Sequence, residues 1–331
     1  MVAAVLDILA IGDALVDVIA TCEPEFVRAR GLAKGAMRLV TAAEADRLHE
    51  AMGASIERPG GSAANSIAAI GAMGGRAGFI GQVAADRLGG VFARDMDSHG
   101  VHFATMPLTG GAPTGRCLIL VTPDGERTMN TAPGASHELA PAALDHGLIA
   151  SAATLYLEGY LWGPAKPRAA MAAAIGIARA AGREIAFTVS GSVGIAGRRN
   201  SFAELIERGK VDLLFANEEE ALQLAGRTDL AAALTELAAR IPTVVVTRGA
   251  AGASAVSGAR RVDVAVVPVA RVVDTTGAGD LFAAGFLTAR AKGAALERCL
   301  EVGAIAASAV IGQVGARPGA VLKELIAPCL I

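Results

Sequence analysis

Asp274-Thr275-Thr276-Gly277-Ala278-Gly279-Asp280 is the stretch of this chain from which fold and chemistry can both be approached. The apolar run over residues 262–273 predicts a strand before it, and apolar side chains at helical spacing over residues 281–291 predict a helix after it. The first backbone N–H groups of such a helix have no intrahelical partner, and the helix dipole adds positive charge there. The glycine turn is therefore predicted to bind an anion with its backbone, next to the carboxylate of Asp280.

An anion hole beside a base that can accept a hydroxyl proton is what phosphoryl transfer to an alcohol requires. The alternative is an ordinary junction between a loop and a helix, in which Asp280 only stabilises the first turn. A single glycine motif does not decide between these interpretations, so the rest of the chain has to.

Composition indicates a globular protein without nucleic-acid or membrane partners. Apolar residues make up 53% of the 331 residues, yet no uncharged apolar run reaches the roughly 18 residues of a membrane-spanning helix. The formal net charge of −2 gives no electrostatic reason to expect nucleic acid or an anionic membrane. Residues 1–11 lack the basic region of a secretion signal, and the four cysteines are scattered without metal-ligand spacing. We therefore expect a cytoplasmic protein with reduced thiols.

Two carboxylates, Asp13 and Asp17, follow the first predicted strand over residues 7–12. Ligands gather at the carboxyl ends of strands in α/β sheets, and an ionised carboxylate can accept two hydrogen bonds from sugar hydroxyls. Turn chemistry is the alternative interpretation for Asp13.

A second glycine stretch, Pro59-Gly60-Gly61-Ser62-Ala63-Ala64-Asn65, opens an alanine-rich helix. Ser62 is a good N-cap residue, and Asn65 three positions later could reinforce the cap. Capping does not require two glycines, whereas close approach of a ligand to the backbone does. The stretch is therefore a second candidate binding site.

Short β-like segments at about residues 13–20, 36–41 and 115–131 are too short for a core sheet and predict a small flap. The last segment contains Thr-Pro-Asp-Gly over residues 122–125, a strong hairpin turn. Arg127 lies just past the tip of this hairpin, where it could reach over a bound phosphate or remain an exposed turn residue.

From residue 139 onward short apolar runs alternate with alanine-rich helical segments. Such alternation predicts βαβ units and a parallel sheet covered by helices on both faces. The predicted strands are residues 154–157, 185–189, 211–215 and 243–247, and the predicted helices are residues 167–181, 218–224 and 230–240.

Polar groups follow two of these strands. Asn217 and Glu220 have the spacing of a capping box, and the same two residues could hold a hydrated Mg²⁺; the sequence leaves both interpretations open. Thr247 is followed by a loop containing Gly249 and Gly252, which is predicted to lie along a nucleotide.

The two glycine stretches, Asn217-x-x-Glu220 and Thr247-x-Gly249 together resemble, in order and spacing, the motifs of the ribokinase (PfkB-type) family of carbohydrate and nucleoside kinases. The resemblance covers nearly the whole chain. It implies one α/β kinase domain over residues 1–331, a Rossmann-like three-layer α/β/α sandwich carrying a small β-sheet lid. The absence of a Gly-Lys-Ser/Thr loop, and of Gly-x-Gly-x-x-Gly after the first strand, argues against a P-loop enzyme or a Rossmann dinucleotide site.

The resemblance also implies roles for the candidate residues, ATP and Mg²⁺ as cofactors, and a lid arginine at Arg127 over the transferred phosphate. A monovalent cation such as K⁺ near residues 274–276 is allowed but not required. Asp280 would be the base, and the backbone of Gly277, Ala278 and Gly279 would form the anion hole. The acceptor would be bound by Asp13, Asp17, Gly61 and Asn65. ATP would be bound by Asn217, Thr247, Gly249, Gly252 and Arg127, and Glu220 would organise Mg²⁺ through water.

Within the family, the chain looks most similar to the adenosine kinase branch, through the long segment between Asp17 and Gly60 and through residues 155–160. Met37, Leu39 and Tyr160 would then flank a purine. Asp13, however, stands where this family usually carries asparagine, and aromatic residues, which could sandwich a base, make up only 4% of the chain.

The resemblance therefore implies transfer of the γ-phosphoryl group of ATP to a primary hydroxyl of a nucleoside, with adenosine as the first candidate. A kinase for fructose, ribose or a sugar acid is the alternative, and a nucleoside sensor without catalysis is a remote one. The sequence is compatible with a monomer and with a homodimer.

Overall fold

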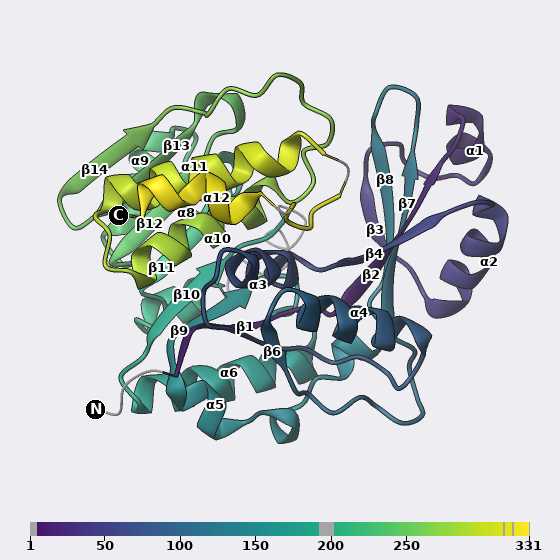
Figure 1. The fold of residues 1–331 in the computed structure, drawn as a ribbon, viewed down its shortest axis with the longest axis horizontal. Helices are drawn as coiled ribbons and strands as arrows, with labels where there is room; N and C mark the ends of the chain where they lie inside the picture. The colour runs from purple at the N-terminus through teal and green to yellow at the C-terminus, as the bar shows by residue number, and fades with distance from the viewer. Residues whose placement is uncertain (1–4, 192–201, 314, 320, 331) are drawn as a thin grey trace.

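The computed structural model describes residues 5–191, 202–313, 315–319 and 321–330. Residues 1–4, part of the stretch considered above as a secretion signal, lie outside the described residues. Two sheets of different size make up the framework, and helices cover both faces of the larger one (Figure 1). The predicted fold class, a three-layer α/β/α sandwich with a small additional sheet, is confirmed.

The large sheet has the strand order β14-β13-β12-β11-β10-β9-β1-β5-β6. Its strands from β12 to β6 are parallel and almost continuously apolar, as expected for strands buried on both faces. The expectation of a parallel sheet is corrected at one edge, where β13 and β14 run antiparallel. The bounds are β1 Leu6–Ile11, β5 Ala77–Ile80, β6 Val101–Phe103, β9 Ala152–Glu158, β10 Glu184–Thr188, β11 Leu213–Asn217, β12 Thr243–Thr247, β13 Ala253–Ser257 and β14 Arg260–Val264.

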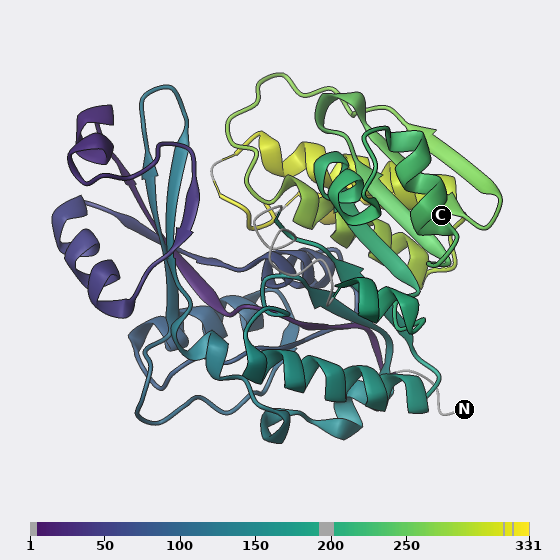
Figure 2. The same cartoon turned by 180° about the vertical axis from the view of Figure 1, so that it is seen from behind.

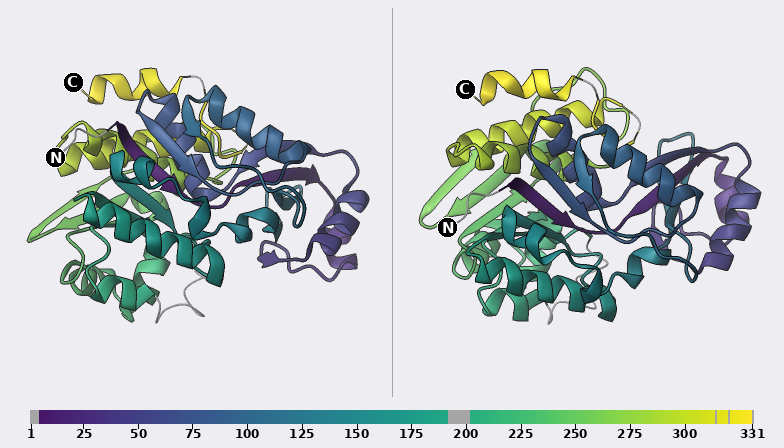
Figure 3. Two further views of the ribbon diagram at one scale, coloured as in Figure 1. Left: turned by 90° about the horizontal axis from the view of Figure 1, so that it is seen from below. Right: turned by 60° about the horizontal axis from the view of Figure 1, so that its bottom comes forward.

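Two helical layers enclose this sheet, as the views in Figure 3 show. Helices α3, α4, α10, α11 and α12 bury their apolar sides against one face, and α5, α6, α8 and α9 against the other. The bounds are α3 Ser62–Ala72, α4 Arg87–Ser98, α5 His146–Ser151, α6 Ala165–Ala180, α8 Glu218–Ala225, α9 Leu230–Ala238, α10 Ala278–Ala291, α11 Leu296–Ile311 and α12 Leu322–Ile326, with 3₁₀ turns at Gly134–Glu138, Pro141–Ala143, Gly249–Ala251 and Ala327–Cys329.

The small sheet has the strand order β3-β8-β7-β2-β4 and carries α1 and α2 on its outer side (Figure 2). The predicted hairpin is confirmed: β7 and β8 pair antiparallel, and the Gly125 N–H donates to the Thr122 carbonyl at 2.8 Å. Strand β4 was not predicted; it pairs with β2 at the edge of the sheet, where Pro59 is tolerated because the edge side needs no backbone N–H donor. The bounds are β2 Leu15–Thr21, β3 Met37–Leu39, β4 Ile56–Gly60, β7 Gly115–Val121, β8 Arg127–Ala132, α1 Pro24–Ala29 and α2 Ala42–Met52.

The strand predicted directly before the glycine turn is wrong in most of its length. Strand β14 ends at Val264, and residues 265–277 form an irregular connection up to α10. Pro268 has no backbone N–H to donate, and Val266 and Val272 are exposed rather than packed against a sheet. A run of apolar residues alone therefore did not identify a strand here.

No helix among the described residues is long and apolar enough to cross a membrane. The cysteines Cys22, Cys117, Cys299 and Cys329 are free thiols.

Candidate active site

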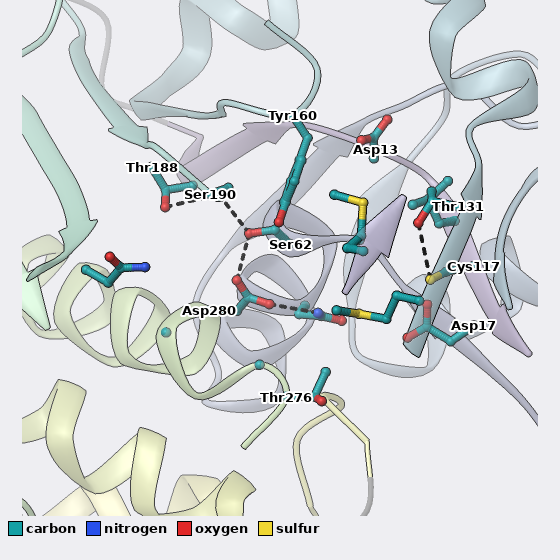
Figure 4. Close-up of a pocket in the computed structure, with 18 of the residues that line it drawn as sticks. Asp13, Asp17, Ser62, Cys117, Thr131, Tyr160, Thr188, Ser190, Thr276 and Asp280 are labelled. Carbon is teal, nitrogen blue, oxygen red and sulfur yellow. Dashed lines mark hydrogen bonds between the residues drawn. The ribbon is translucent and has the colours of Figure 1, made fainter. Parts of the chain in front are cut away.

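A cavity of about 470 Å³ lies between the small sheet and the carboxyl ends of the large-sheet strands (Figure 4). Most predicted site residues line it, although they come from distant parts of the sequence. The lining includes Asp13, Asp17, Met37, Leu39, Gly61, Asn65, Tyr160, Asn217, Glu220, Thr247, Gly277, Gly279 and Asp280. Four predicted residues are not among the lining residues: Arg127, Gly249, Gly252 and Ala278.

The glycine turn before α10 has the geometry that an anion hole needs. Gly277 occupies the N-cap position with φ +78°, a conformation that favours glycine. A Cβ atom on this residue would lie 2.5 Å from the Cβ of Ala316, so packing also requires glycine. The N–H of Ala278 donates to the Thr275 carbonyl at 3.2 Å, which leaves the turn at Gly277 and Gly279 as the part that faces the cavity.

Asp280 lies in the first turn of α10 and accepts two side-chain hydrogen bonds from α3. Ser62 Oγ donates to Oδ1 at 2.7 Å, and Asn65 Nδ2 donates to Oδ2 at 2.8 Å (Figure 4). Burial raises the pKa of Asp280 to about 6, against the opposing effect of these hydrogen bonds and of the Arg317 charge. A carboxylate with a pKa near neutrality is suited to accept a proton during a reaction at physiological pH.

The predicted cap of α3 is wrong, because the helix begins at Ser62 with Gly61 in the N-cap position and no side-chain cap. Ser62 and Asn65 instead donate to Asp280. Gly61 has φ +93°, and a Cβ atom there would overlap the backbone carbonyl oxygen of Asp13. The glycine is thus required by packing against the loop that carries Asp13.

Glu158, a residue that sequence reasoning did not single out, ties two parts of the site together. It is fully buried at the end of β9, and its carboxylate accepts hydrogen bonds from the N–H groups of Asp13 and Ala63, each at 2.6 Å. Burial and the nearby Asp13 carboxylate raise the pKa of Glu158 well above its usual value. A charged residue closing an apolar strand was the signal that could have identified it. Asp13 itself also accepts a hydrogen bond from Ser136.

Asp17 lies within β2 rather than in a loop, and its side chain faces the cavity. A Cβ atom on Gly60 would lie 2.5 Å from Asp17 Oδ1, so the first glycine of the pair leaves room for this carboxylate. Burial raises the pKa of Asp17 to about 6, although the charges of Arg317 and Arg127 oppose the shift. Gly60 is therefore explained by the carboxylate of Asp17, and Gly61 by the backbone carbonyl of Asp13.

The capping-box interpretation of Asn217 and Glu220 is confirmed at the start of α8. Asn217 Oδ1 accepts from the Glu220 N–H, and Glu220 Oε2 accepts from the Asn217 N–H, both at 2.8 Å. Glu220 Oε1 also accepts from the Gly191 N–H at 2.6 Å, and burial raises the pKa of this carboxyl. Each oxygen retains a second lone pair, so the residue fits a Mg²⁺ ion held through water better than one bound directly.

Arg127 pairs with Asp274, the first residue of the glycine stretch. Asp274 is buried and also accepts from the N–H groups of Thr276 at 2.9 Å and Gly315 at 2.7 Å. The small sheet is thereby connected to the loop that precedes the anion hole. Gly252, with φ +87°, packs against the backbone of Val264 rather than along the cavity.

The small sheet gives the cavity an apolar wall that the sequence only partly indicated. Met37 and Leu39 were predicted, and the wall also contains Cys117, Ile119 and Met129 from the β7–β8 hairpin. These three could have been found from the alternation of the hairpin sequence, because every second residue faces the same side. The cavity therefore has a carboxylate-rich end and an aliphatic, sulfur-rich side.

A helix N-terminus with a glycine turn, a neighbouring carboxylate of near-neutral pKa and a cavity roofed by a second sheet define a phosphotransferase that acts on a hydroxyl group. The family model of the pfkB family carbohydrate kinases matches residues 7–322, and the chain belongs to this family. As a kinase of this family it uses ATP, and Mg²⁺ is typical.

Solved structures and curated proteins support the same class. Adenosine kinase from Sinorhizobium meliloti superimposes with a TM-score of 0.93 at 45% identity, covering 98% of this chain and 99% of that one. A probable sugar kinase from Rhizobium etli CFN 42 superimposes with a TM-score of 0.94 at 41% identity, covering 99% and 100%. The ATP-dependent ribose-1-phosphate kinase of Halopiger xanaduensis is 32% identical over 284 residues, which are 82% of this chain and 88% of that protein.

Proposed function

We propose that the protein transfers the γ-phosphoryl group of ATP to the primary hydroxyl of adenosine, giving AMP and ADP. The observation that carries this proposal is the two-sided cavity. Carboxylate and amide groups of Asp17, Asn65 and Asp280 suit ribose hydroxyls, whereas Met37 and Met129 offer an apolar surface for a purine. A free sugar has hydroxyls all round and gains little from such a wall.

In the proposed reaction, Asp280 accepts the proton of the acceptor hydroxyl as its oxygen attacks the γ-phosphorus, and ADP leaves. The backbone N–H groups at Gly277 and Gly279 stabilise negative charge on the transferred phosphoryl group. Ser62 and Asn65 hold the Asp280 side chain in place through the two hydrogen bonds described above. Asp17, Asp13 and Gly61 position the sugar.

We assign the ATP side of the cavity to Asn217 and Thr247, with Gly249 and Gly252 shaping the adjacent β12–β13 connection. When bound, Mg²⁺ would neutralise phosphate charge, and Glu220 is the residue that would hold its waters. A K⁺ ion near Asp274 is less favoured than ATP and Mg²⁺ as a ligand of this site, because Arg127 and two backbone N–H groups already bind the Asp274 carboxylate.

We further propose that the small sheet acts as a lid, with segments at about residues 13–20, 36–41 and 115–131 as its moving part. Closure would exclude water, which otherwise competes with the hydroxyl as acceptor. The link between Arg127 and Asp274 is the contact that would have to open and close, and Arg127 would then reach the phosphates in the loaded enzyme.

A kinase for fructose, ribose or a sugar acid is the second candidate. It is favoured by Arg38 and His137, which add polar groups to the cavity lining, and by Asp13, which replaces the asparagine usual in the family. Whichever acceptor is used, Asp280 keeps the same role.

The decisive experiment is ATP consumption by the purified protein with Mg²⁺, against adenosine, other nucleosides, ribose, fructose and sugar acids. We expect turnover with adenosine at a micromolar KM and formation of AMP. A matched assay with Met129→Gln should raise the adenosine KM about tenfold, since burial of apolar surface against a base contributes roughly 1–2 kcal/mol. Turnover with a sugar but not with adenosine would overturn the proposed acceptor.

A further inference from the structure

Arg317 connects the candidate base to a second acidic residue outside the cavity. Its Nη1 donates to Asn65 Oδ1 at 2.7 Å, and its Nε donates to Asp95 Oδ2 at 2.8 Å. Asn65 in turn donates through Nδ2 to Asp280. A continuous chain of hydrogen bonds therefore runs from Asp95 in α4, through Arg317 and Asn65, to Asp280 in α10.

This chain determines which way the Asn65 amide points. An amide has one accepting and one donating end, and an arginine can only donate. Because Arg317 occupies the accepting oxygen of Asn65, the amide nitrogen is directed at Asp280. Without the guanidinium, the amide would be free to rotate and present its oxygen to the carboxylate, which would repel it.

The charge of Arg317 is retained at a cost. The side chain is only 11% exposed, and its Nη2 is buried with no hydrogen-bond partner among the described residues. An unpaired buried donor destabilises a protein, and such groups are uncommon outside sites that use them. The guanidinium charge acts on Asp17 as well as on Asp280, so it affects two of the three carboxylates assigned to the acceptor site.

We propose that Arg317 is a positioning residue for the base: it orients the Asn65 amide toward Asp280 and supplies the positive charge that keeps Asp280 ionised until it accepts the proton. This inference rests on the proposed function, because it assumes that Asp280 accepts the proton. Arg317 acts through Asn65 and through its electric field, and it is not among the residues that line the cavity.

Other groups around Asp280 push in the opposite direction. Glu220 from α8, Asp17 from β2 and Glu158 from β9 are carboxyl groups whose negative charge disfavours the ionised form of Asp280. Tyr156 and Tyr160, from β9 and the turn after it, face the site as neutral phenols, because burial and the Asp280 charge raise their own pKa. The positive charge of Arg317 opposes these carboxyl groups at Asp280. Asp95, which faces Arg317, lies 3.6 Å from His99 Nε2.

The test is the pH dependence of kcat between pH 5 and 9 for Arg317→Met and Arg317→Lys. Arg317→Met removes charge and hydrogen bonds, so the acid limb of kcat should move up by about one pH unit, a tenfold loss on that limb. Arg317→Lys keeps the charge, so its limb should stay within about 0.3 unit of the wild type even if the plateau falls. kcat is used because Asp17, whose pKa is also about 6, should act on the acceptor KM.

Arg290→Met is the matched control. Arg290 is also a partly buried arginine, paired with Glu184 at 2.6 Å, but it lies at the far end of α10 from Asp280. Its removal should leave the acid limb in place. If Arg317→Met lowers the plateau without moving the limb, or if Arg290→Met moves it equally, Arg317 has only a structural role and the proposal fails.

A direct titration separates this inference from the proposed function. The ¹³C resonance of the Asp280 carboxyl, identified by its absence in Asp280→Asn, should titrate about one unit higher in Arg317→Met than in the wild type, whether or not any acceptor is phosphorylated. An unshifted titration would overturn the inference even in an active kinase. If Arg317→Met does not fold, Asp95→Asn takes its place: freeing Arg317 of its carboxylate partner should lower the Asp280 midpoint, and an unchanged or raised midpoint would overturn the proposal.

Discussion

The helices of this molecule start in two different ways, and both ways occur at the cavity. Helices α3 and α10 have glycine in the N-cap position, Gly61 and Gly277, both with positive φ and neither with a side-chain cap. Helix α8, at the other side of the cavity, and helix α2, on the outside of the small sheet, begin with complete capping boxes built on Asn217 and Thr41. Helices thus begin in this protein both with and without a capping side chain.

The difference is that a capping box uses its polar side chains for the helix itself. At α8 the side chains of Asn217 and Glu220 satisfy each other's backbone N–H groups. At α3 and α10 the polar residues of the first turn are free to meet across the site, where Ser62 and Asn65 donate to Asp280. Uncapped starts with glycine are therefore where reaction chemistry is expected, and capped starts are where ligand positioning is expected.

The largest effect should follow from changing the carboxylate at the start of α10. Asp280→Asn keeps the shape and can still bond to Ser62 and Asn65, but it removes the base. We expect kcat to fall by about two to four powers of ten with ATP binding retained, measured by steady-state kinetics and by calorimetric titration with ATP. Turnover at the wild-type rate would show that Asp280 is not the base.

The same substitution has a predicted effect on stability. The pKa of Asp280 is about 6 in the folded protein and 3.8 as the reference value, so the folded state binds the proton more tightly. Its contribution to stability is present below about pH 4 and is lost as pH rises through 6. Asp280→Asn should therefore have the melting temperature of the wild type at pH 4 and a higher one at pH 7.5. A difference that does not grow with pH would contradict the raised pKa.

Much of the fold could be predicted because it depends on local periodicity. The strands β9 to β12 and helices α6, α8 and α9 lie within a few residues of their predicted bounds. The failures are local too. Strand β13, Ala253–Ser257, is rich in alanine and serine and carries little β-propensity, and the connection over residues 265–277 is apolar without being a strand.

The site was predictable only where a residue's chemistry could be read from its neighbours in sequence. Gly277 and Gly279 predicted a turn, and Asp280 directly follows them in the sequence. Glu158 and Arg317 act through partners more than 90 positions away, Ala63 and Asn65, so their roles could not be predicted from neighbouring residues. The only local signal was the charge of Glu158 at the end of an apolar strand. The Ser62 cap was wrong for the same reason, since its hydroxyl binds Asp280 from a distant helix instead of its own backbone.

A smaller effect should follow from filling the uncapped start of α3. In Gly61→Ala the new methyl group would overlap the Asp13 carbonyl oxygen, in addition to straining the backbone at φ +93°. Gly53→Ala is the matched control: Gly53 has φ +71°, but a Cβ atom there would have nothing within 4 Å. We expect Gly61→Ala to lower the free energy of unfolding by about 1–3 kcal/mol more than Gly53→Ala, because overpacking adds to backbone strain. The acceptor KM should rise only in Gly61→Ala. If denaturant unfolding shows that both variants lose the same stability, the loop carrying Asp13 moves aside without an energetic penalty, and the prediction is wrong.

The smallest effect is expected at the capped helices, where it separates capping from binding. Asn217→Ala and Thr41→Ala each remove one capping box and should each lower the free energy of unfolding by about 1 kcal/mol. Because Asn217 also lines the cavity, its loss should raise the KM for MgATP about fivefold, the worth of roughly one hydrogen bond, whereas Thr41→Ala should leave that KM unchanged. If both variants lose the same stability and neither changes the MgATP KM, Asn217 serves only to start α8, and the ATP side of the cavity must be recognised by other residues.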